Sequence, residues 1–393
     1  MKQNARPHLS LMTGWKPMCK RSLNVLQILP NLGVGGVERG TVQLTVALVN
    51  KGHRAFVISG TGPLVTEIEQ AGGKHLPLKV GRKNPFVLLL IPKLVRLFIE
   101  HKIDIVHSRS RLPAWLTMVA LKLIPKNKRP VWFTTVHGPY SVNFYSSIMN
   151  KGDQVIAVSN FIKDYVYDNY TIPKDKEITV IHRGVEENEY KNNFMPTETW
   201  GRGWKNATNY PPGAKILTLA GRITRWKGQL EFIKLVNQVR SQGIDAHGLI
   251  VGGIENKYSN YCKELIHLIK ILGLEDKIML LGARSDLKEI FSISDCAYSL
   301  TSKPEAFGRT TVEALSLGTP VIGYDHGGTS EVLKTMFPSG LVPPHDLKRA
   351  VELTTNLLTN TSNLALIKSN PYTVSQMQSK TIALYEKVTE RQK

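Results

Sequence analysis

Short runs of apolar and β-branched residues alternate along most of the chain with longer stretches in which apolar residues recur at helical spacing. In the first half this pattern predicts strands at residues 24–29, 54–58, 103–107, 131–136, 154–158 and 178–181, and helices between them, for example at 37–51, 113–123 and 160–169. From about residue 213 the rhythm restarts, with strands predicted at 215–220, 248–251, 278–281, 296–300 and 320–324. Alternating strands and helices are typical of parallel sheets with crossover helices. The two runs predict an α/β protein with two doubly wound, Rossmann-like domains.

Polar residues rich in proline and glycine mark the predicted domain boundary. The segment NNFMPTETWGRGWKNATNYPPG at 192–213 shows no sustained period and predicts an irregular linker. The predicted organisation is therefore a basic N-terminal extension, a first domain, the linker, a second domain and a terminal helix after Pro371, at residues 1–21, 22–191, 192–213, 214–371 and 372–393. Two similar domains that face one another leave a cleft, and the carboxyl ends of both sets of strands point into it.

The most informative polar residues lie between positions 299 and 333. Glu305 follows a predicted buried strand, Glu313 lies eight residues later in a predicted helix, and a Gly327-Gly328 turn opens the next helix. These residues place two carboxylates and several backbone N–H groups at the carboxyl edge of a parallel sheet, where open α/β sheets bind ligands. Carboxylates beside an anion site suit a ligand that has many hydroxyls and also carries phosphate. A nucleotide sugar is such a ligand.

Glu313 has an alternative, purely structural interpretation. Thr310 and Glu313 have the spacing of a capping box, in which the carboxylate only accepts a hydrogen bond at the start of the helix. Glu305 has no helix to cap, because its loop is flanked by proline and glycine. We therefore interpret the two carboxylates as a functional pair.

A cluster of cations follows the first strand of the second domain. Arg222, Arg225 and Lys227 crowd into one strand-to-helix turn, which is electrostatically costly unless an anion binds. An arginine fork and a lysine point charge would together hold a diphosphate. A solvated cationic face is the alternative.

A glycine-rich turn follows the first strand of the chain. Gly33, Gly35 and Gly36 lie between this strand and the next helix, so backbone N–H groups could approach a phosphate closely. The turn is not a dinucleotide-binding fingerprint, because the third glycine of that pattern would fall on Glu38. A tight turn with no ligand is the alternative.

Polar residues also end two further strands of the first domain. His137 ends an apolar strand, and this position favours a functional role over the structural role that a lone histidine more often has. In the run HSRSR at 107–111, Arg109 and Arg111 are candidate contacts to an acceptor or a phosphate. An ordinary surface loop is the alternative for this run.

The positive charge is concentrated in the first 150 residues. The chain has a net charge of +20, and residues 1–150 contain 21 Lys and Arg against 5 Asp and Glu, a net charge of +16. This asymmetry favours an acidic partner. No nucleic-acid-binding module is recognisable. An anionic membrane surface or a phosphorylated glycan or glycolipid acceptor fits the charge, and a generally basic proteome is the alternative.

The chain also lacks the marks of a membrane-spanning or secreted protein. The most apolar stretch, residues 85–99, is interrupted by Pro92, Lys93 and Arg96 and predicts a partly buried helix. The N-terminus is basic but has no apolar core of a secretory signal. The three cysteines at positions 19, 262 and 296 lack metal-ligand spacing. We expect a reduced, cytoplasmic protein that at most lies peripherally on the inner membrane.

In combination and order, these motifs resemble those of retaining glycosyltransferases with the GT-B fold, family 4 (the group 1 glycosyltransferases). The resemblance covers nearly the whole chain and rests on GGVER (35–39), TVHG (135–138), VIAVSN (155–160), VIHRGV (180–185), GRITRWKG (221–228) and the E-x7-E segment. HSRSRLPAW and PEAFGRTTVEA are similar to the bacterial branch that builds the lipopolysaccharide core. The resemblance implies that the terminal helix crosses back to the first domain. It also implies metal-independent transfer, without a cofactor, from a UDP-, GDP- or ADP-sugar.

The resemblance assigns a role to each candidate donor-site residue. It implies that Arg222 and Lys227 hold the donor diphosphate, that Glu305 contacts the transferred sugar near the anomeric centre, and that His137 faces that sugar. It further places Gly35, Gly36 and the backbone N–H groups of Phe307 and Gly308 at the phosphates, and Glu313 at the ribose. The implied reaction retains the anomeric configuration. A nucleotide-sugar hydrolase, epimerase or phosphorylase of the same fold, and a non-catalytic basic protein that binds nucleic acid or membrane, are the competing hypotheses.

Overall fold

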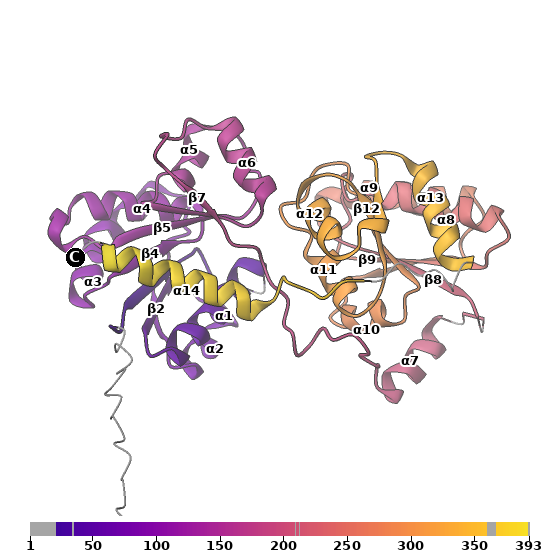
Figure 1. Ribbon diagram of the computed structural model, residues 1–393, viewed down its shortest axis with the longest axis horizontal. Coiled ribbons are helices and arrows are strands. Elements are labelled where there is room, and N and C mark those ends of the chain that lie inside the picture. The colour runs from indigo at the N-terminus through magenta and orange to yellow at the C-terminus, as the bar shows by residue number, and fades with distance from the viewer. Residues whose placement is uncertain (1–20, 34, 209, 212, 360–366, 392–393) are drawn as a thin grey trace, which may run out of the picture.

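The computed structural model describes residues 21–33, 35–208, 210–211, 213–359 and 367–391. Within these ranges the chain forms two α/β bodies side by side (Figure 1). The first contains a parallel seven-stranded sheet in the order β3-β2-β1-β4-β5-β6-β7, and the second a parallel six-stranded sheet in the order β10-β9-β8-β11-β12-β13. The predicted α/β architecture with two doubly wound sheets is confirmed.

The first sheet and its helices come from the N-terminal half of the chain. Its strands are β1 (Asn24–Ile28), β2 (Arg54–Ser59), β3 (Lys74–Pro77), β4 (Ile105–Ser108), β5 (Val131–Val136), β6 (Gln154–Ala157) and β7 (Ile178–Val180). Its helices are α1 (Gly36–Asn50), α2 (Val65–Gln70), α3 (Ile91–Glu100), α4 (Arg111–Lys122), α5 (Phe144–Ser147) and α6 (Asn160–Asn169), with short 3-10 helices η1 (Pro85–Leu90), η2 (Lys126–Lys128) and η3 (Ile148–Asn150). Both β4 and β5 are buried along their whole length, as expected for inner strands of a parallel sheet that is covered on both faces.

The second sheet follows the same alternation. Its strands are β8 (Lys215–Ala220), β9 (Ala246–Val251), β10 (Ile278–Gly282), β11 (Cys296–Ser299), β12 (Val321–Tyr324) and β13 (Leu341–Val342). The helices of this half are α7 (Glu198–Thr208), α8 (Gln229–Ser241), α9 (Ser259–Ile271), α10 (Leu287–Ser292), α11 (Arg309–Ser316), α12 (Gly327–Met336) and α13 (Leu347–Thr359), with η4 (Asn256–Tyr258) and η5 (Pro338–Gly340). The predicted strands of both halves are confirmed with shifts of a few residues, whereas the short edge strands β3 and β13 were not predicted.

The predicted irregular linker is wrong in its central part, because residues 198–208 form helix α7. Trp200 and Trp204 stack on one face of this helix, with ring centroids 5.1 Å apart. Both pack against the buried residues Ile216 and Leu249 of the second sheet. The tryptophans are four residues apart, which is helical spacing, but Gly201 and Gly203 lie between them and made a helix look unfavourable in the sequence.

The terminal helix α14 (Val374–Arg391) returns to the first domain, as predicted. Figure 1 shows it lying along the first α/β body beside α1. Ile382 and Tyr385 are fully buried in one apolar cluster with Val25 and Leu44 of the first domain. The helix is therefore part of the core of that domain rather than an appendage.

Residues 1–20 of the predicted N-terminal extension, which include Cys19, lie outside the described residues. The other two cysteines, Cys262 and Cys296, are buried free thiols. The apolar stretch around Pro92 forms η1 and α3, with the proline in the first turn of α3 where it blocks no helical hydrogen bond. Among the described helices, none has the length and apolar character needed to cross a membrane.

Candidate active site

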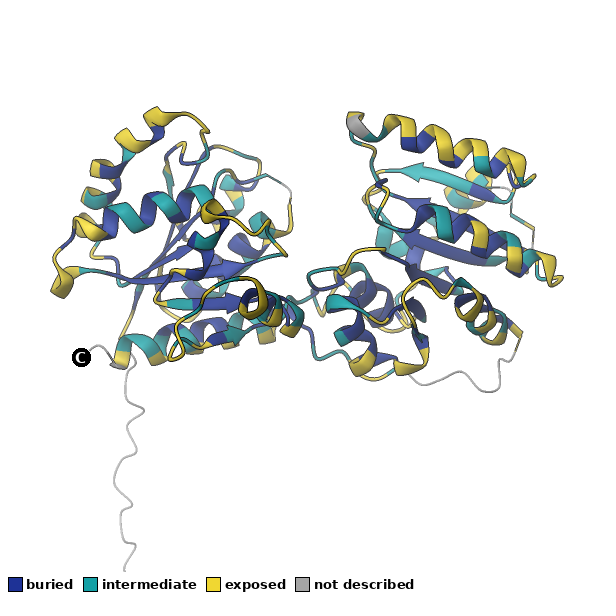
Figure 2. Ribbon diagram, turned by 90° about the horizontal axis from the view of Figure 1, so that it is seen from above, coloured by how far each residue is buried: buried dark blue, intermediate teal, exposed yellow. Residues whose placement is uncertain are grey.

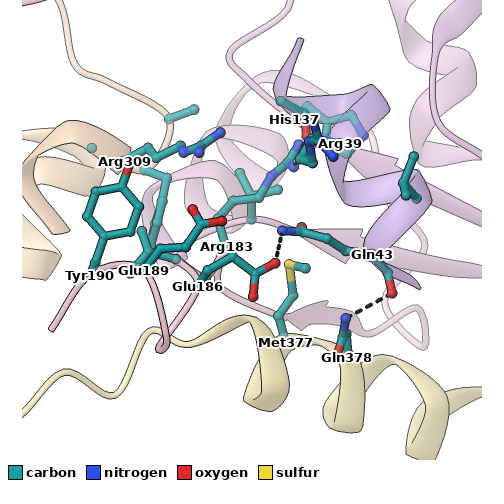
Figure 3. Close-up of a pocket in the computed structure, with 18 of the residues that line it drawn as sticks. Arg39, Gln43, His137, Arg183, Glu186, Glu189, Tyr190, Arg309, Met377 and Gln378 are labelled. Atoms are coloured by element: carbon teal, nitrogen blue, oxygen red, sulfur yellow. Dashed lines mark hydrogen bonds between the residues drawn. The ribbon is translucent and has the colours of Figure 1, made fainter. Parts of the chain in front are cut away.

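A cleft of about 660 Å³ lies between the two domains, where the carboxyl ends of both sheets face one another. Figure 3 shows the cleft with α1 on one side, the segment around Glu186 and Tyr190 that links the domains, and α14 below. The predicted site residues that line it are Gly36, His137, Glu305, Phe307 and Gly308. Residues that carry charge into the cleft without having been assigned a role are Arg39, Glu67, Arg183, Glu186, Glu189 and Arg309.

The glycine turn meets the cleft at the start of α1. Gly35 is the N-cap of this helix and Gly36 is its first residue. The Gly36 carbonyl oxygen accepts a hydrogen bond of 3.0 Å from Arg183. A Cβ atom on Gly36 would lie 3.9 Å from the Arg309 guanidinium of the second domain. Gly36 therefore brings the start of α1 close to cations from two other segments.

Lys227 and Glu305 form an ion pair at the second-domain side. The Lys227 Nζ lies 2.7 Å from the Glu305 Oε1, and the two side chains are 16% and 15% exposed. They reach each other from the loops that follow β8 and β11, two neighbouring strands. The structure thus brings together two predicted residues that are 78 positions apart in the sequence.

Arg222 is placed differently from Lys227. Its guanidinium bonds to Glu255 at 2.7 Å, and its side chain is 66% exposed. It does not line the cleft. Arg225, in the same turn, pairs with Glu264 and is also exposed. Of the three cations of this turn, Lys227 is the one that bonds to a residue of the cleft.

Gly308 sets the direction of α11. It is the N-cap of that helix in a left-handed conformation with φ of 84°. A Cβ atom there would lie 2.9 Å from the Thr329 hydroxyl oxygen, so a side chain would collide with α12. Because the first turn of an α-helix has N–H groups without intrahelical acceptors, α11 presents its N-terminus toward the cleft as a potential anion site. Phe307 is buried beside it.

Glu313 is buried on α11 and does not form the capping box. Its carboxylate accepts a 2.7 Å hydrogen bond from Arg309, and Gly308 caps the helix without a side-chain bond. Burial raises the pKa of the Glu313 carboxyl, and the Arg309 guanidinium opposes that rise. The capping box raised by the sequence is therefore not formed. Glu313 does not line the cleft, but Arg309 beside it does.

His137 lies at the carboxyl end of β5 and faces the cleft. Its Nδ1 accepts a 2.8 Å hydrogen bond from Arg183. Its Nε2 is buried and has no hydrogen-bond partner among the described residues. Burial lowers the pKa of His137 well below 6.5, and the positive charges of Arg183 and Arg109 lower it further.

The two candidate acceptor arginines lie outside the main cleft. Arg109 is 6% exposed, donates to the Gln27 side chain and lines a narrow cavity of about 30 Å³ that adjoins the cleft at His137 and Arg183. Arg111 bonds to Ser146 and lies over the Tyr140 ring, 5.0 Å from its centroid. Arg109 is therefore near the cleft, and Arg111 belongs to the surface around α4 and α5.

A carboxylate contact between the domains was not predicted. Glu331 of α12 accepts hydrogen bonds from the backbone N–H groups of Asn160 and Phe161 at the start of α6, at 3.0 and 2.6 Å, and from the Asn160 side chain. It also bonds to His182 at 3.0 Å. Nearby, the Ser159 hydroxyl donates to the Ala306 carbonyl at 2.6 Å, next to Glu305.

Arg183 and Glu331 both fall in or beside motifs that the sequence displayed. VIHRGV contains Arg183, and the GG turn precedes Glu331 by a few residues. Arg183 bonds to Gly36 and His137, 147 and 46 positions away, and Glu331 bonds to Asn160, 171 positions away, so the contacts themselves were not visible in the sequence. Among the described residues, no group of three or more His, Cys, Asp or Glu side chains is arranged to hold a metal ion.

Comparison with known proteins agrees with this geometry. One family model, described as Glycosyltransferase Family 4, matches residues 34–189, and a second, described as Glycosyl transferases group 1, matches residues 202–372. An N-acetyl-alpha-D-glucosaminyl L-malate synthase of Bacillus anthracis is 25% identical over 78% of this chain and 79% of its own length. A lipopolysaccharide core biosynthesis mannosyltransferase, LpsB of Rhizobium meliloti, is 23% identical over 67% of this chain and 72% of its own length.

Solved structures share the two-domain arrangement. A glycosyltransferase from Rickettsia africae superimposes with a TM-score of 0.75 at 29% identity, covering 93% of this chain and 98% of that chain. Anabaena HepE, solved in complex with UDP and glucose, superimposes with a TM-score of 0.76 at 20% identity, covering 93% of this chain and 100% of that chain. The facing α/β domains and the cleft between them are those of the GT-B fold, and the two family models give the class, glycosyltransferase. The chain belongs to the group 1 glycosyltransferases and resembles the enzymes that build the lipopolysaccharide core.

Proposed function

We propose that the protein transfers a sugar from a nucleoside diphosphate donor to a glycan or glycolipid acceptor of the cell envelope, with retention of the anomeric configuration. The observation that carries the proposal is the Lys227–Glu305 pair, held at 2.7 Å at the edge of the interdomain cleft. The name of the Rhizobium meliloti relative and the UDP and glucose bound to HepE support the acceptor class and the donor class, respectively.

The residues of the cleft can perform the parts of such a transfer. Lys227 and the N-terminus of α11 would stabilise the negative charge that develops on the leaving diphosphate. Glu305 would then be released from Lys227 to contact hydroxyls of the transferred sugar. Arg222 would add its charge by exchanging Glu255 for the diphosphate, a change that its 66% exposure permits. Glu313, through Arg309, fixes the start of α11 on which the phosphates would rest.

Binding of the full chain to UDP, GDP, ADP, CMP, NAD and a short DNA tests the donor site. We expect a preference for one nucleoside diphosphate that Lys227→Ala abolishes and Arg222→Ala weakens. Arg225→Ala is the matched control, because it removes a cation of the same turn that pairs outside the cleft with Glu264. Binding of NAD or DNA alone would contradict the proposal. Release of free sugar from the donor at an equal rate with and without acceptors would indicate a hydrolase instead.

Retention is proposed to occur with the acceptor attacking from the face that the diphosphate leaves. A covalent double displacement needs a carboxylate nucleophile opposite the leaving group. Glu67 and Glu186 are engaged with Arg39 and Gln43, and Glu305 lies beside Lys227, which would hold the leaving diphosphate, rather than opposite it. A glycosyl adduct on Glu305 or Glu189, detected by intact-protein mass spectrometry, would contradict this mechanism. An inverted product of Glu305→Gln would contradict it as well.

We also propose that the first domain contacts an anionic membrane that carries the acceptor. Phe86, Leu88 and Leu89 of η1 are 72%, 56% and 74% exposed, and they follow the exposed cations Arg82 and Lys83. Figure 2 shows the exposed positions of both domains in yellow. Apolar side chains beside cations suit a surface of anionic headgroups over acyl chains.

Co-sedimentation with vesicles tests the membrane contact. We expect binding to vesicles with phosphatidylglycerol, weaker binding at high salt, and none to neutral phosphatidylcholine. Phe86→Ser with Leu89→Ser should weaken binding, and so should Arg82→Glu with Lys83→Glu. Ile266→Ser, at an exposed apolar position of the second domain, is the control. Unchanged binding in both double variants would show that another surface, or none, is used.

A further inference from the structure

Arg183 connects three parts of the cleft. It lies in the segment that follows β7, where the chain leaves the first sheet. One terminal nitrogen donates to the Gly36 carbonyl at 3.0 Å and the other to the His137 Nδ1 at 2.8 Å. Figure 3 shows its side chain extending across the cleft toward His137. A Cβ atom on Gly40 would lie 3.2 Å from an Arg183 terminal nitrogen, so the glycine leaves room for this path.

The contact determines where the proton of the histidine ring lies. A guanidinium group has N–H donors and no acceptor, so the His137 Nδ1 must present its lone pair to Arg183. The ring then carries its hydrogen on Nε2. A doubly protonated ring would set two donors against each other, and burial together with the charges of Arg183, Arg109 and His107 lowers the pKa of His137.

The Nε2 atom of His137 takes no part in the contact with Arg183. It is buried, it has no partner among the described residues, and His137 lines the cleft. A buried donor without an acceptor is unfavourable, so an oxygen of a bound ligand would complete the hydrogen bonding of the ring. Arg183 itself contacts the ring from the side away from that position.

We propose that Arg183 is a positioning residue that fixes His137 as the neutral tautomer with hydrogen on Nε2, so that this N–H donates to an oxygen of the substrate in the cleft. The inference rests on the proposed function for the identity of the substrate. The arrangement of Arg183 and His137 does not depend on it, and the first test below needs no substrate.

NMR of the full chain with labelled histidine tests the tautomer directly. We expect the His137 ring to show an unprotonated Nδ1 and a protonated Nε2 in the ligand-free protein, and to lose this fixed state in Arg183→Met. Arg39→Met, which removes another cation of the cleft that pairs with Glu67, should leave the His137 signal unchanged. A protonated Nδ1 in the unmodified protein would overturn the proposal.

Kinetics with substitutions at both positions give the second test. Glutamine places an amide near the position of Nε2 and asparagine near that of Nδ1, so His137→Gln should retain more activity than His137→Asn. Arg183→Met should lower kcat on the order of 100-fold, with a smaller change in donor KM, because the group is misplaced rather than removed. Arg183→Lys should recover part of the loss. Equal activity of both His137 variants, or an Arg183→Met defect confined to KM, would refute the proposal. A correct tautomer in a protein without transferase activity would refute the proposed function alone.

Discussion

The contact between Glu331 and the start of α6 predicts how firmly the two domains are held together. Glu331 lies in the second domain and accepts hydrogen bonds from the backbone N–H groups of Asn160 and Phe161, which belong to the first domain. Ser159 is the N-cap of α6, and the Glu331 carboxylate adds hydrogen bonds to the first two N–H groups of the helix and a negative charge at its positive end. Glu331→Ala removes both interactions, and with them the hydrogen bond to His182.

The size of the effect follows from these two interactions. Loss of the hydrogen bonds to the backbone N–H groups costs about 1 kcal/mol net, and loss of a charge at a partly buried helix terminus costs about 1 kcal/mol more. The sum of about 2 kcal/mol corresponds to a shift of about 30-fold in the equilibrium between the domain arrangement seen here and more open ones. Glu331→Gln keeps one acceptor oxygen and loses the charge, so its effect should be about half as large in free energy.

Small-angle scattering and steady-state kinetics give two independent measures of the shift toward more open domain arrangements. We expect a larger radius of gyration for Glu331→Ala than for the unmodified protein, and a fall in kcat/KM of up to about 30-fold, because transfer needs the cleft closed against water. Asn160→Ala combined with Glu331→Ala should add little to the single Glu331 change, since the two side chains share one contact. An unchanged radius of gyration together with unchanged kcat/KM would refute the reasoning.

Three further predictions concern stability. Tyr385→Ala should lower the free energy of unfolding in urea by about 3–5 kcal/mol. Tyr385→Phe removes only the hydroxyl bonded to His107 and should lower it by about 1–3 kcal/mol. Equal effects of the two substitutions would contradict the packing role of the ring. Gly308→Ala should lower the melting temperature and the donor affinity together, because a φ of 84° costs about 1–2 kcal/mol for alanine and the added Cβ atom meets Thr329. An unchanged melting temperature would argue against strain at this N-cap. The raised pKa of Glu313 means that the folded protein holds the carboxyl proton more tightly than the unfolded chain, so the contribution of this group to stability is present at low pH and is lost as pH rises through the folded pKa. Glu313→Gln should therefore stabilise the protein at about pH 7.5 and much less at about pH 4. The opposite trend would show that the ion pair with Arg309 dominates.

The sequence predicted the fold well where single segments carry the signal. Strands such as β5 are short runs of apolar and β-branched residues, and the carboxyl ends of β11 and β5 located Glu305 and His137 at the cleft. Contacts to a partner distant in sequence could not be predicted. Arg222 and Lys227 looked equivalent in sequence, whereas the structure pairs Arg222 with Glu255 and Lys227 with Glu305, and no local pattern distinguishes the two.

Arg183 shows the same limit for the site itself. Its position in VIHRGV was visible, but its role follows from where Gly36 and His137 come together in space. Helix α7 was missed for a different reason. Its stability comes from the two tryptophans that pack on the second sheet, whereas its glycines lower the helix propensity on which a prediction from sequence depends.

The return of α14 to the first domain has a consequence for synthesis of the chain. β7 ends at Val180 and α14 begins at Val374, so the first sheet emerges from the ribosome long before the helix that completes its core. At about 5–20 residues per second, the interval is on the order of 10–40 s. During that time the surface that will receive Ile382 and Tyr385 is uncovered and available to chaperones. A chain that terminates early keeps this apolar surface exposed, so the surface that stabilises complete copies is one that chaperones and proteases can recognise on incomplete ones.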